Sequence, residues 1–175
     1  DGAFNGCNIP TSNAGFEVVN NILVRYSGND TIVNVPKGIT VIGPNAFHGE
    51  QIKKIMLPEG VKTICNRAFN GLKSLSEVSI PESLETIESS AFSFCYKLSS
   101  VHLSGATNIG AEAFQHCSSL KDVVLSERLK SIESGVFSSC RALKSIGVKG
   151  LHGMIESVLP EELKEQDKIG IEYDS

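Results

Sequence analysis

The first candidates for chemistry in this chain are its cysteines. Three of the five, Cys95, Cys117 and Cys140, stand 22 and 23 residues apart. In a small secreted protein, paired cysteines would form a disulfide framework, but an odd number leaves one thiol over. The near-constant spacing favours a stack of equivalent positions, so we expect buried free thiols that act as small hydrophobic groups. Cys65 breaks this series, falls in a predicted exposed turn, and is the candidate for a reactive thiol.

No set of residues in the sequence matches a known catalytic or metal-binding pattern. His116 and Cys117 are adjacent, but neighbours rarely share one metal ion, and no C-x-x-C or H-x-x-x-H spacing supports them. The hydrolase motif G-x-S-x-G does not occur, and the glycines of residues 147–153 lack the Lys-Ser/Thr ending of a phosphate loop. We therefore predict a protein that is not an enzyme and that uses no metal or cofactor.

Composition and charge argue against two further classes of function. The 175 residues carry a net charge of −4, and the longest basic run is Lys53-Lys54, whereas nucleic-acid binding needs a basic stripe. No apolar run approaches the ~18–20 residues of a membrane-spanning helix. The hydrophobic content of 41% is enough for one domain with a continuous core. Residues 1–4 resemble the middle of a repeat, so we expect part of a longer or processed chain.

A repeat fixes where these residues must lie. Phenylalanines recur at steps of 22, 23, 22 and 23 residues, at Phe47, Phe69, Phe92, Phe114 and Phe137. Each belongs to a unit whose fullest form, over residues 91–103, reads A-F-x-x-C-x-x-L-x-x-V-x-L. A period of this length with an L-x-x-L-x-L pattern falls in the leucine-rich range of ~20–29 residues, so the sequence predicts a solenoid.

Each unit is expected to form one coil. Short strands with two inward apolar residues are predicted over residues 33–35, 55–57, 78–80, 101–103, 123–125 and 146–148. A proline follows each of the first three strands and ends it: Pro36, Pro58 and Pro81. A second apolar pair, such as Leu84 and Ile87, comes next. The i, i+3, i+6 spacing of Phe92, Cys95 and Leu98 then predicts a short helical turn. The expected fold is an α/β solenoid, a leucine-rich repeat array with a parallel β-sheet on one face and short helical turns opposite.

The two ends depart from the regular unit. Residues 16–35 alternate apolar and polar side chains around two turn signals, which predicts an inserted hairpin with strands near 16–19, 22–26 and 31–35. Residues 160–168 are mostly polar and suit a helix in a terminal coil. We divide the single domain into a partial repeat (1–15), a hairpin-containing coil (16–35), regular repeats (36–150) and a divergent C-terminal coil or cap (151–175).

The pattern I-P-x-x-L-x-x-I-x-x-x-A-F-x-x-C-x-x-L-x-x-V over residues 80–101 resembles the BspA-like leucine-rich repeats. The match covers residues 33–150 well and departs at Ser104 and Ser126, where proline is expected. The hairpin over 15–30 also resembles an insert common in bacterial members. The resemblance implies a surface or secreted protein of a bacterium or parasitic protist, in a family with several members implicated in adhesion. It implies no ligand site that transfers residue by residue.

The outer face of the predicted sheet, the concave face of such arrays, is the candidate binding surface. Two columns of outward side chains line it: Lys54, Met56, Glu77, Ser79, Ser100, His102, Asp122 and Val124. We predict a non-enzymatic protein-binding or adhesion module of a secreted or cell-surface protein, with a host extracellular or cell-surface protein as its partner. The columns hold no aromatic or arginine anchor, so a spacer without a ligand of its own and an ordinary solvated sheet face remain the alternatives.

Overall fold

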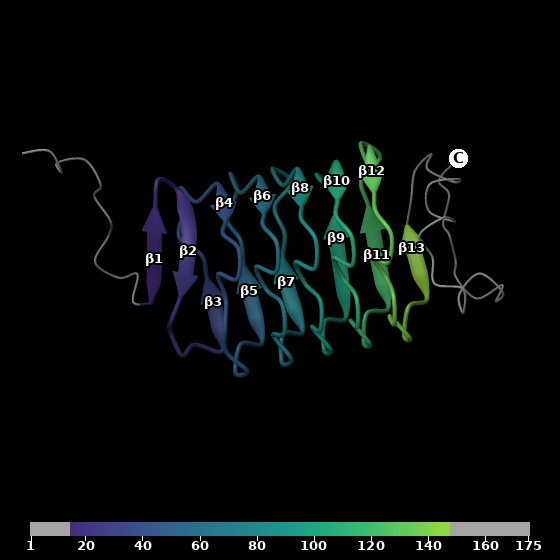
Figure 1. Ribbon diagram of the computed structural model, residues 1–175, viewed down its shortest axis with the longest axis horizontal. Coiled ribbons are helices and arrows are strands. Elements are labelled where there is room, and N and C mark those ends of the chain that lie inside the picture. The colour runs from purple at the N-terminus through teal and green to yellow at the C-terminus, as the bar shows by residue number, and fades with distance from the viewer. Residues whose placement is uncertain (1–14, 148–175) are drawn as a thin grey trace, which may run out of the picture.

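The structure, a computed structural model, describes residues 15–147. Over this range the backbone winds as a solenoid, and each regular coil contributes one strand to a wall of longer strands and one two-residue strand to a second wall (Figure 1). The predictions for residues 1–14 and 148–175, which include the partial repeat and the terminal helix, lie outside the described residues.

The first wall consists of two three-stranded parallel sheets, ordered β3-β5-β7 and β13-β11-β9. Their bounds are β3 Ile32–Asn34, β5 Lys54–Met56, β7 Glu77–Ser79, β9 Ser100–Leu103, β11 Asp122–Leu125 and β13 Ser145–Gly147. The central residues point inward: Ile55 is fully buried and Val101 is 1% exposed. The strands predicted at these places are confirmed, each beginning one residue earlier than expected.

The prolines account for the lengths of these strands. β5 and β7 precede Pro58 and Pro81 and have three residues, whereas β9 and β11 run up to Ser104 and Ser126 and have four. Proline lacks an N–H group and restricts the residue before it, so the serines allow one more residue to join the ladder. No ladder joins β7 to β9 in the described part of the chain. The wall is therefore divided between β7, the last strand followed by a proline, and β9, which is followed by a serine.

The second wall is a seven-stranded sheet that the sequence did not predict, ordered β1-β2-β4-β6-β8-β10-β12. Its bounds are β1 Phe16–Val19, β2 Ile22–Tyr26, β4 Val41–Ile42, β6 Thr63–Ile64, β8 Thr86–Ile87, β10 Asn108–Ile109 and β12 Ser131–Ile132. β1 and β2 form the predicted antiparallel hairpin, with the expected bounds. The remaining neighbours pair in parallel, so the hairpin is the N-terminal edge of this sheet.

The predicted helical turns opposite the sheet are wrong, because residues 15–147 contain no helix. Positive φ angles flank each Ala-Phe pair: Arg67, Ser90 and Glu112 stand directly before a pair, and Gly71, Phe94 and His116 stand two residues after the phenylalanine. An α-helix needs consecutive residues near φ −63°, so these left-handed residues interrupt it within one turn. The backbone hydrogen bonds run between coils instead; the Phe92 N–H donates to the Ala113 carbonyl at 2.8 Å.

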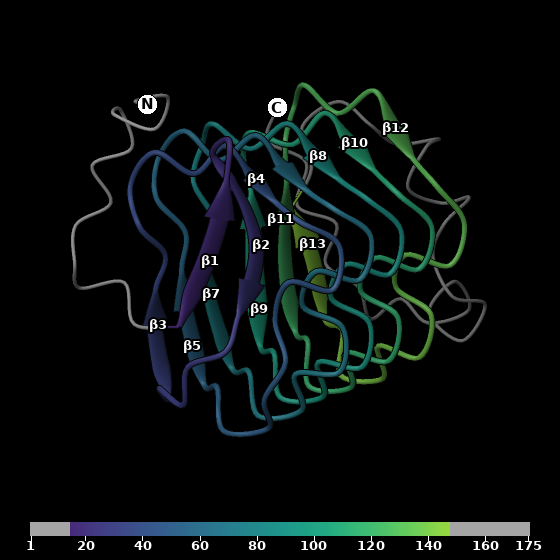
Figure 2. The same cartoon turned by 60° about the vertical axis from the view of Figure 1, so that its left-hand side comes forward.

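The five repeated phenylalanines form one buried column through the array, and each is fully buried. Successive ring centroids are 4.9 Å apart for Phe47–Phe69, 4.9 Å for Phe69–Phe92, 5.1 Å for Phe92–Phe114 and 6.1 Å for Phe114–Phe137. Tyr26 and Phe16 of the hairpin continue the column at 5.5 and 4.7 Å. The turned view shows the longer strands along one wall and the turns closing each coil (Figure 2). The hairpin therefore joins the aromatic core rather than standing apart from it.

Candidate functional site

The sequence-predicted site residues lie on the outer face of the two three-stranded sheets. The register forms two quartets: Lys54, Met56, Glu77 and Ser79 on β5 and β7, and Ser100, His102, Asp122 and Val124 on β9 and β11. Within each quartet the residues are direct cross-strand neighbours. The missing ladder between β7 and β9 separates the quartets, so the structure brings four residues together twice rather than eight along one continuous sheet.

Charged groups on this face already have partners. The Lys54 Nζ atom lies 2.6 Å from Glu77 Oε1, and both side chains are solvent-accessible. The Ser145 hydroxyl donates to Asp122 Oδ1 at 2.7 Å. Exposed ion pairs of this kind contribute about 0–1 kcal/mol to stability. The two carboxylates are thus occupied within the face and do not converge on a common point where a reaction would take place.

Apolar side chains are also exposed on this face. Met56 is 38% exposed and Val124 is 37% exposed, one in each quartet. Ile32 of β3 is 54% exposed and pairs in register with Lys54, beside the first quartet. Large apolar side chains gathered within a polar surface mark contact sites more often than single exposed residues do. The face therefore has apolar centres bordered by paired polar groups.

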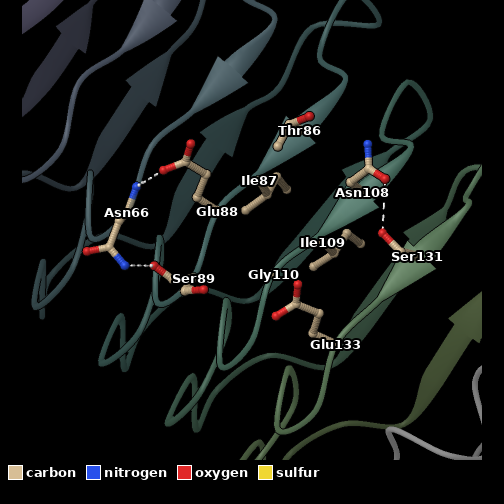
Figure 3. Close-up of a pocket in the computed structure, with 10 residues that line it drawn as sticks. All are labelled: Asn66, Thr86, Ile87, Glu88, Ser89, Asn108, Ile109, Gly110, Ser131 and Glu133. Carbon is tan, nitrogen blue, oxygen red and sulfur yellow. Dashed lines mark hydrogen bonds between the residues drawn. The ribbon is translucent and has the colours of Figure 1, made fainter.

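A hollow of about 300 Å³ lies on the second wall (Figure 3). Its carboxylates serve the backbone: Glu88 Oε2 accepts from the Asn66 N–H at 2.8 Å, and Glu133 Oε2 accepts from the Ala111 N–H at 3.1 Å. The Ser131 hydroxyl donates to Asn108 Oδ1 at 2.9 Å. Each of these bonds links one coil to the next. The polar groups of the hollow thus have a structural role, because they hydrogen-bond one coil to the next.

A larger hollow of about 650 Å³ lies beside the hairpin and the first regular coil, and Arg25 and His48 are among its lining residues. Tyr26 also lines it, and its hydroxyl donates to Asp30 Oδ2 at 2.6 Å. Burial, followed by this hydrogen bond, raises the pKa of Tyr26 above its ordinary value. The tyrosine is therefore a protonated structural donor that holds the loop after β2.

The thiol column is confirmed as free and buried, with Cys95, Cys117 and Cys140 at most 1% exposed. Each Sγ donates to a phenylalanine carbonyl of an adjacent coil at 3.1–3.2 Å: Cys95 to Phe69, Cys117 to Phe92 and Cys140 to Phe114. Burial raises the pKa of Cys95 and of Cys140 to about 12, and that of Cys117 well above its usual value. These thiols are protonated at neutral pH and have no nucleophilic role.

Cys65 is half-buried rather than exposed. Burial, followed by the charge of Glu88, raises the pKa of its thiol, which argues against the predicted reactivity. Across residues 15–147 no three His, Cys, Asp or Glu side chains are close enough to hold a metal ion. In the same part of the chain, no helix is long and apolar enough to cross a membrane.

Sequence reasoning missed one surface feature. Phe94 and Tyr96 are 37% and 39% exposed, and the Phe94 ring stacks on His116 of the next coil with centroids 4.7 Å apart. Aligning the repeats would have found them, because Gly49, Gly71, His116 and Ser139 stand at the position of Phe94 in other coils, and no other coil has an aromatic residue at the position of Tyr96.

Comparisons with known proteins agree with this geometry. The model of the BspA type leucine rich repeat region matches residues 40–157 in six copies. A leucine rich repeat protein of T. pallidum, TpLRR, is 33% identical with a TM-score of 0.69, and the match covers 72% of this chain and 62% of that one. A leucine rich cell surface protein from Faecalibacterium prausnitzii A2-165 is 25% identical with a TM-score of 0.68, covering 78% of this chain and 37% of that one.

The pneumococcal vaccine antigen PcpA has the same fold at 24% identity, with a TM-score of 0.72, covering 91% of this chain and 44% of that one. The chain thus spans less than two thirds of the length of each of these three structures. A comparison with curated proteins found no match. The six matched repeats cover most of the chain, and one solved relative is one-third identical over 72% of it. The chain therefore belongs to the BspA-type leucine-rich repeat family.

Proposed function

We propose that this chain is a protein-recognition module of a bacterial cell-surface protein, used in adhesion, and that its partner binds the outer face of the two three-stranded sheets. Proteins of this repeat family typically act as protein-interaction or surface modules and are generally not enzymes. The F. prausnitzii relative is described as a cell surface protein, which supports the location. The partner is an extracellular or cell-surface protein of a host.

The observation that carries this proposal is the exposure of Met56 and Val124 on an otherwise polar sheet. A protein interface has an apolar centre bordered by hydrogen-bonding groups, and methionine is enriched in such centres. Both quartets follow this arrangement, since Met56 stands beside the Lys54–Glu77 pair and Val124 stands beside Asp122. The parallel backbone holds these side chains in fixed positions, which lowers the entropic cost of binding.

The test is a triple variant, Met56→Glu, His102→Glu and Val124→Glu, which places charge in both quartets. Binding of the fluorescently labelled chain is measured on cultured epithelial cells and on immobilised extracellular-matrix proteins. If the face binds the partner, affinity falls at least about tenfold, because buried unpaired carboxylates oppose association. Far-UV circular dichroism and a thermal melt establish that the variant keeps the fold.

A matched control adds three glutamates at exposed neutral positions away from this face: Val19, Asn29 and Ser134. Its net charge equals that of the first variant, so a loss seen only in the first variant reports the face and not the charge. If the first variant keeps both its fold and its binding, the outer face is not the binding surface. If the unmodified chain binds none of the cells or proteins, the result favours a structural spacer.

A further inference from the structure

The turn that follows Phe92 carries a cluster of exposed rings. Phe94 stacks on the His116 imidazole with centroids 4.7 Å apart and planes 20° from parallel. Tyr96 stands nearly perpendicular to Phe94, with centroids 6.2 Å apart and an interplanar angle of 78°. Both Phe94 and Tyr96 are more than one-third exposed, whereas the repeated Phe92 is fully buried. The cluster is therefore separate from the aromatic column of the core.

The fold does not require a ring at position 94. The backbone of Phe94 has φ +63°, in the left-handed region that large side chains rarely occupy and that carries a cost. The same turn is made by Gly71 in the preceding coil with φ +75°, by His116 in the next with φ +60° and by Ser139 in the one after with φ +61°. Glycine suits this conformation without strain. Phe94 thus places an apolar ring on the surface at a position where the coil closes equally well without one.

On the side away from His116, no stacked ring covers Phe94 among residues 15–147, and the side chain is 37% exposed. Two hydrogen bonds show which coils lie on either side of Phe94. The Gly71 N–H donates to the Ser93 carbonyl at 2.9 Å, and the Phe94 N–H donates to the Gln115 carbonyl at 2.9 Å. His116 covers the ring on the side of the next coil. On the opposite side stands Gly71, where a Cβ atom would meet nothing within 4 Å. A ring or a flat apolar group of a partner fits beside Gly71, against Phe94 and bordered by Tyr96.

The same edge of the array carries an excess of positive charge. We define the basic ridge as the turns that lead into the strands of the first wall, residues 50–53, 73–76, 96–99, 118–121 and 141–144. It presents six exposed cations, namely Lys53, Lys73, Lys97, Lys121, Arg141 and Lys144, and one exposed carboxylate, Glu50. The whole chain has a net charge of −4, so this edge opposes the charge of the molecule. Tyr96 belongs to the ridge, and Phe94 lies two residues before it.

We infer that the basic ridge is a second interaction surface, and that it binds an acidic segment of a protein partner that presents an aromatic or proline ring to the open face of Phe94. Aromatic side chains act as anchors at protein interfaces, with polar contacts around them. The cations complement carboxylates along the segment and speed its association. None of its cations or rings belongs to the two quartets of the sheet.

A peptide fits this edge better than a nucleic acid does. Glu77 and Asp122 stand at the first positions of β7 and β11, directly after ridge turns, and Glu50 pairs with Lys73 at 2.8 Å. The phosphodiester backbone of a nucleic acid carries a negative charge at every nucleotide, and these charges would meet the carboxylates of the edge. A polypeptide with acidic residues at some positions and neutral ones at others accommodates this mixed pattern.

The test begins with a phage-displayed library of roughly 12-residue random peptides, selected on the immobilised chain after depletion on the Phe94→Gly variant. The expected selection is peptides with an aromatic or proline residue flanked by Asp or Glu. A fluorescein-labelled selected peptide is then titrated by anisotropy. Its affinity should fall about tenfold or more in Phe94→Gly and in Lys97→Glu/Lys121→Glu, and should weaken with added salt. Lys130→Glu, an exposed lysine away from the ridge, is the control and should bind normally.

Melting temperatures and peptide binding by two further variants test the inference independently. Phe94→Gly should melt at the same temperature as the unmodified chain or higher, since glycine relieves the left-handed strain; a lower melting temperature would assign the ring to the fold. Tyr96→Ser should also lose the peptide. The triple variant of the sheet face should keep it, which separates this surface from the proposed function. Selection of basic peptides, affinity unaffected by Phe94→Gly, or Phe94-dependent binding of oligothymidylate or heparin without acidic peptides would overturn the inference.

Discussion

Replacing Phe92 with alanine removes a ring from the middle of the aromatic column. The side chain is fully buried between Phe69 and Phe114, with centroid distances of 4.9 and 5.1 Å. Hydrogen bonds between coils, such as Phe92 N–H to the Ala113 carbonyl, hold the spacing of the backbone, so the cavity closes poorly. We expect a loss of about 4–5 kcal/mol, the upper part of the usual range for this change, because two ring contacts of about 0.5–1.5 kcal/mol each are lost with the buried area.

The same reasoning ranks a second position and a control. Phe137 has one stacking partner in the described part of the chain, Phe114, at a longer centroid distance of 6.1 Å. Phe137→Ala should therefore cost about 3 kcal/mol, the lower end of the range. Ser99 is exposed, and its hydroxyl lies 3.3 Å from the Ser76 carbonyl. Ser99→Ala should change the free energy of unfolding by no more than about 0.5 kcal/mol.

The assay is urea unfolding followed by far-UV circular dichroism, with the free energy obtained by linear extrapolation. Domains are typically stable by about 5–15 kcal/mol, so the Phe92→Ala chain should be largely unfolded or should unfold at a much lower urea concentration. Each coil contacts only its neighbours, so a central cavity also uncouples the two halves and should lower the m-value. If Phe92→Ala and Ser99→Ala unfold at the same urea midpoint, the column does not stabilise the array and the reasoning fails.

Two further predictions concern the thiols and one glycine. Burial raises the pKa of Cys95 and Cys140 from an ordinary value near 9 to about 12, so their contribution to stability is complete below about pH 9 and is lost as the pH rises toward 12. Between about pH 8 and about pH 10.5, the free energy of unfolding obtained from urea titrations should therefore fall less in Cys95→Ala than in the unmodified chain, by about 1.4 kcal/mol for each pH unit above about 9, and an equal fall would contradict this. Gly105→Ala would make its Cβ atom overlap the Glu82 carbonyl oxygen and should cost about 1–3 kcal/mol, whereas Gly147→Ala, with 3.7 Å to its nearest neighbour, should cost little. Thermal melts compare the two, and equal melting temperatures would contradict the prediction.

The features that the sequence predicted correctly are those set by burial. A residue that must face the core in every coil has to be apolar in every coil, and so Phe47 and Phe137 mark the same column although 90 residues separate them. The long strands follow for the same reason, because their inward residues alternate with outward ones. Once the strands are aligned, the cross-strand neighbours of the outer face follow as well, including the pairing of Lys54 with Glu77.

The features that the sequence did not predict are set by backbone hydrogen bonds. Strands such as β6 and β8 have two residues each, too few to show an alternating pattern, and the bonds between coils define them. The i, i+3 spacing of apolar residues is shared by helices and by successive turns. Residues in the left-handed conformation exclude the helix here. Arg67, Ser90 and Glu112 are not residue types typical of this conformation, so the sequence gives no sign of it.

Comparing coils within this one chain locates surface residues that the fold does not explain. The core rows vary little, with phenylalanine at all five positions of the aromatic column, because each ring packs against the next. In the row of the basic ridge that contains Tyr96, successive coils place Lys73, Tyr96, Ser118 and Arg141, and all four turns close in the same way. Closure of the turn therefore does not choose among these side chains, and the contact that Tyr96 makes is with the exposed Phe94 ring rather than with the core. Phe94 also bears left-handed strain that Gly71 avoids, and the proposed contact with a partner would account for a ring at this position.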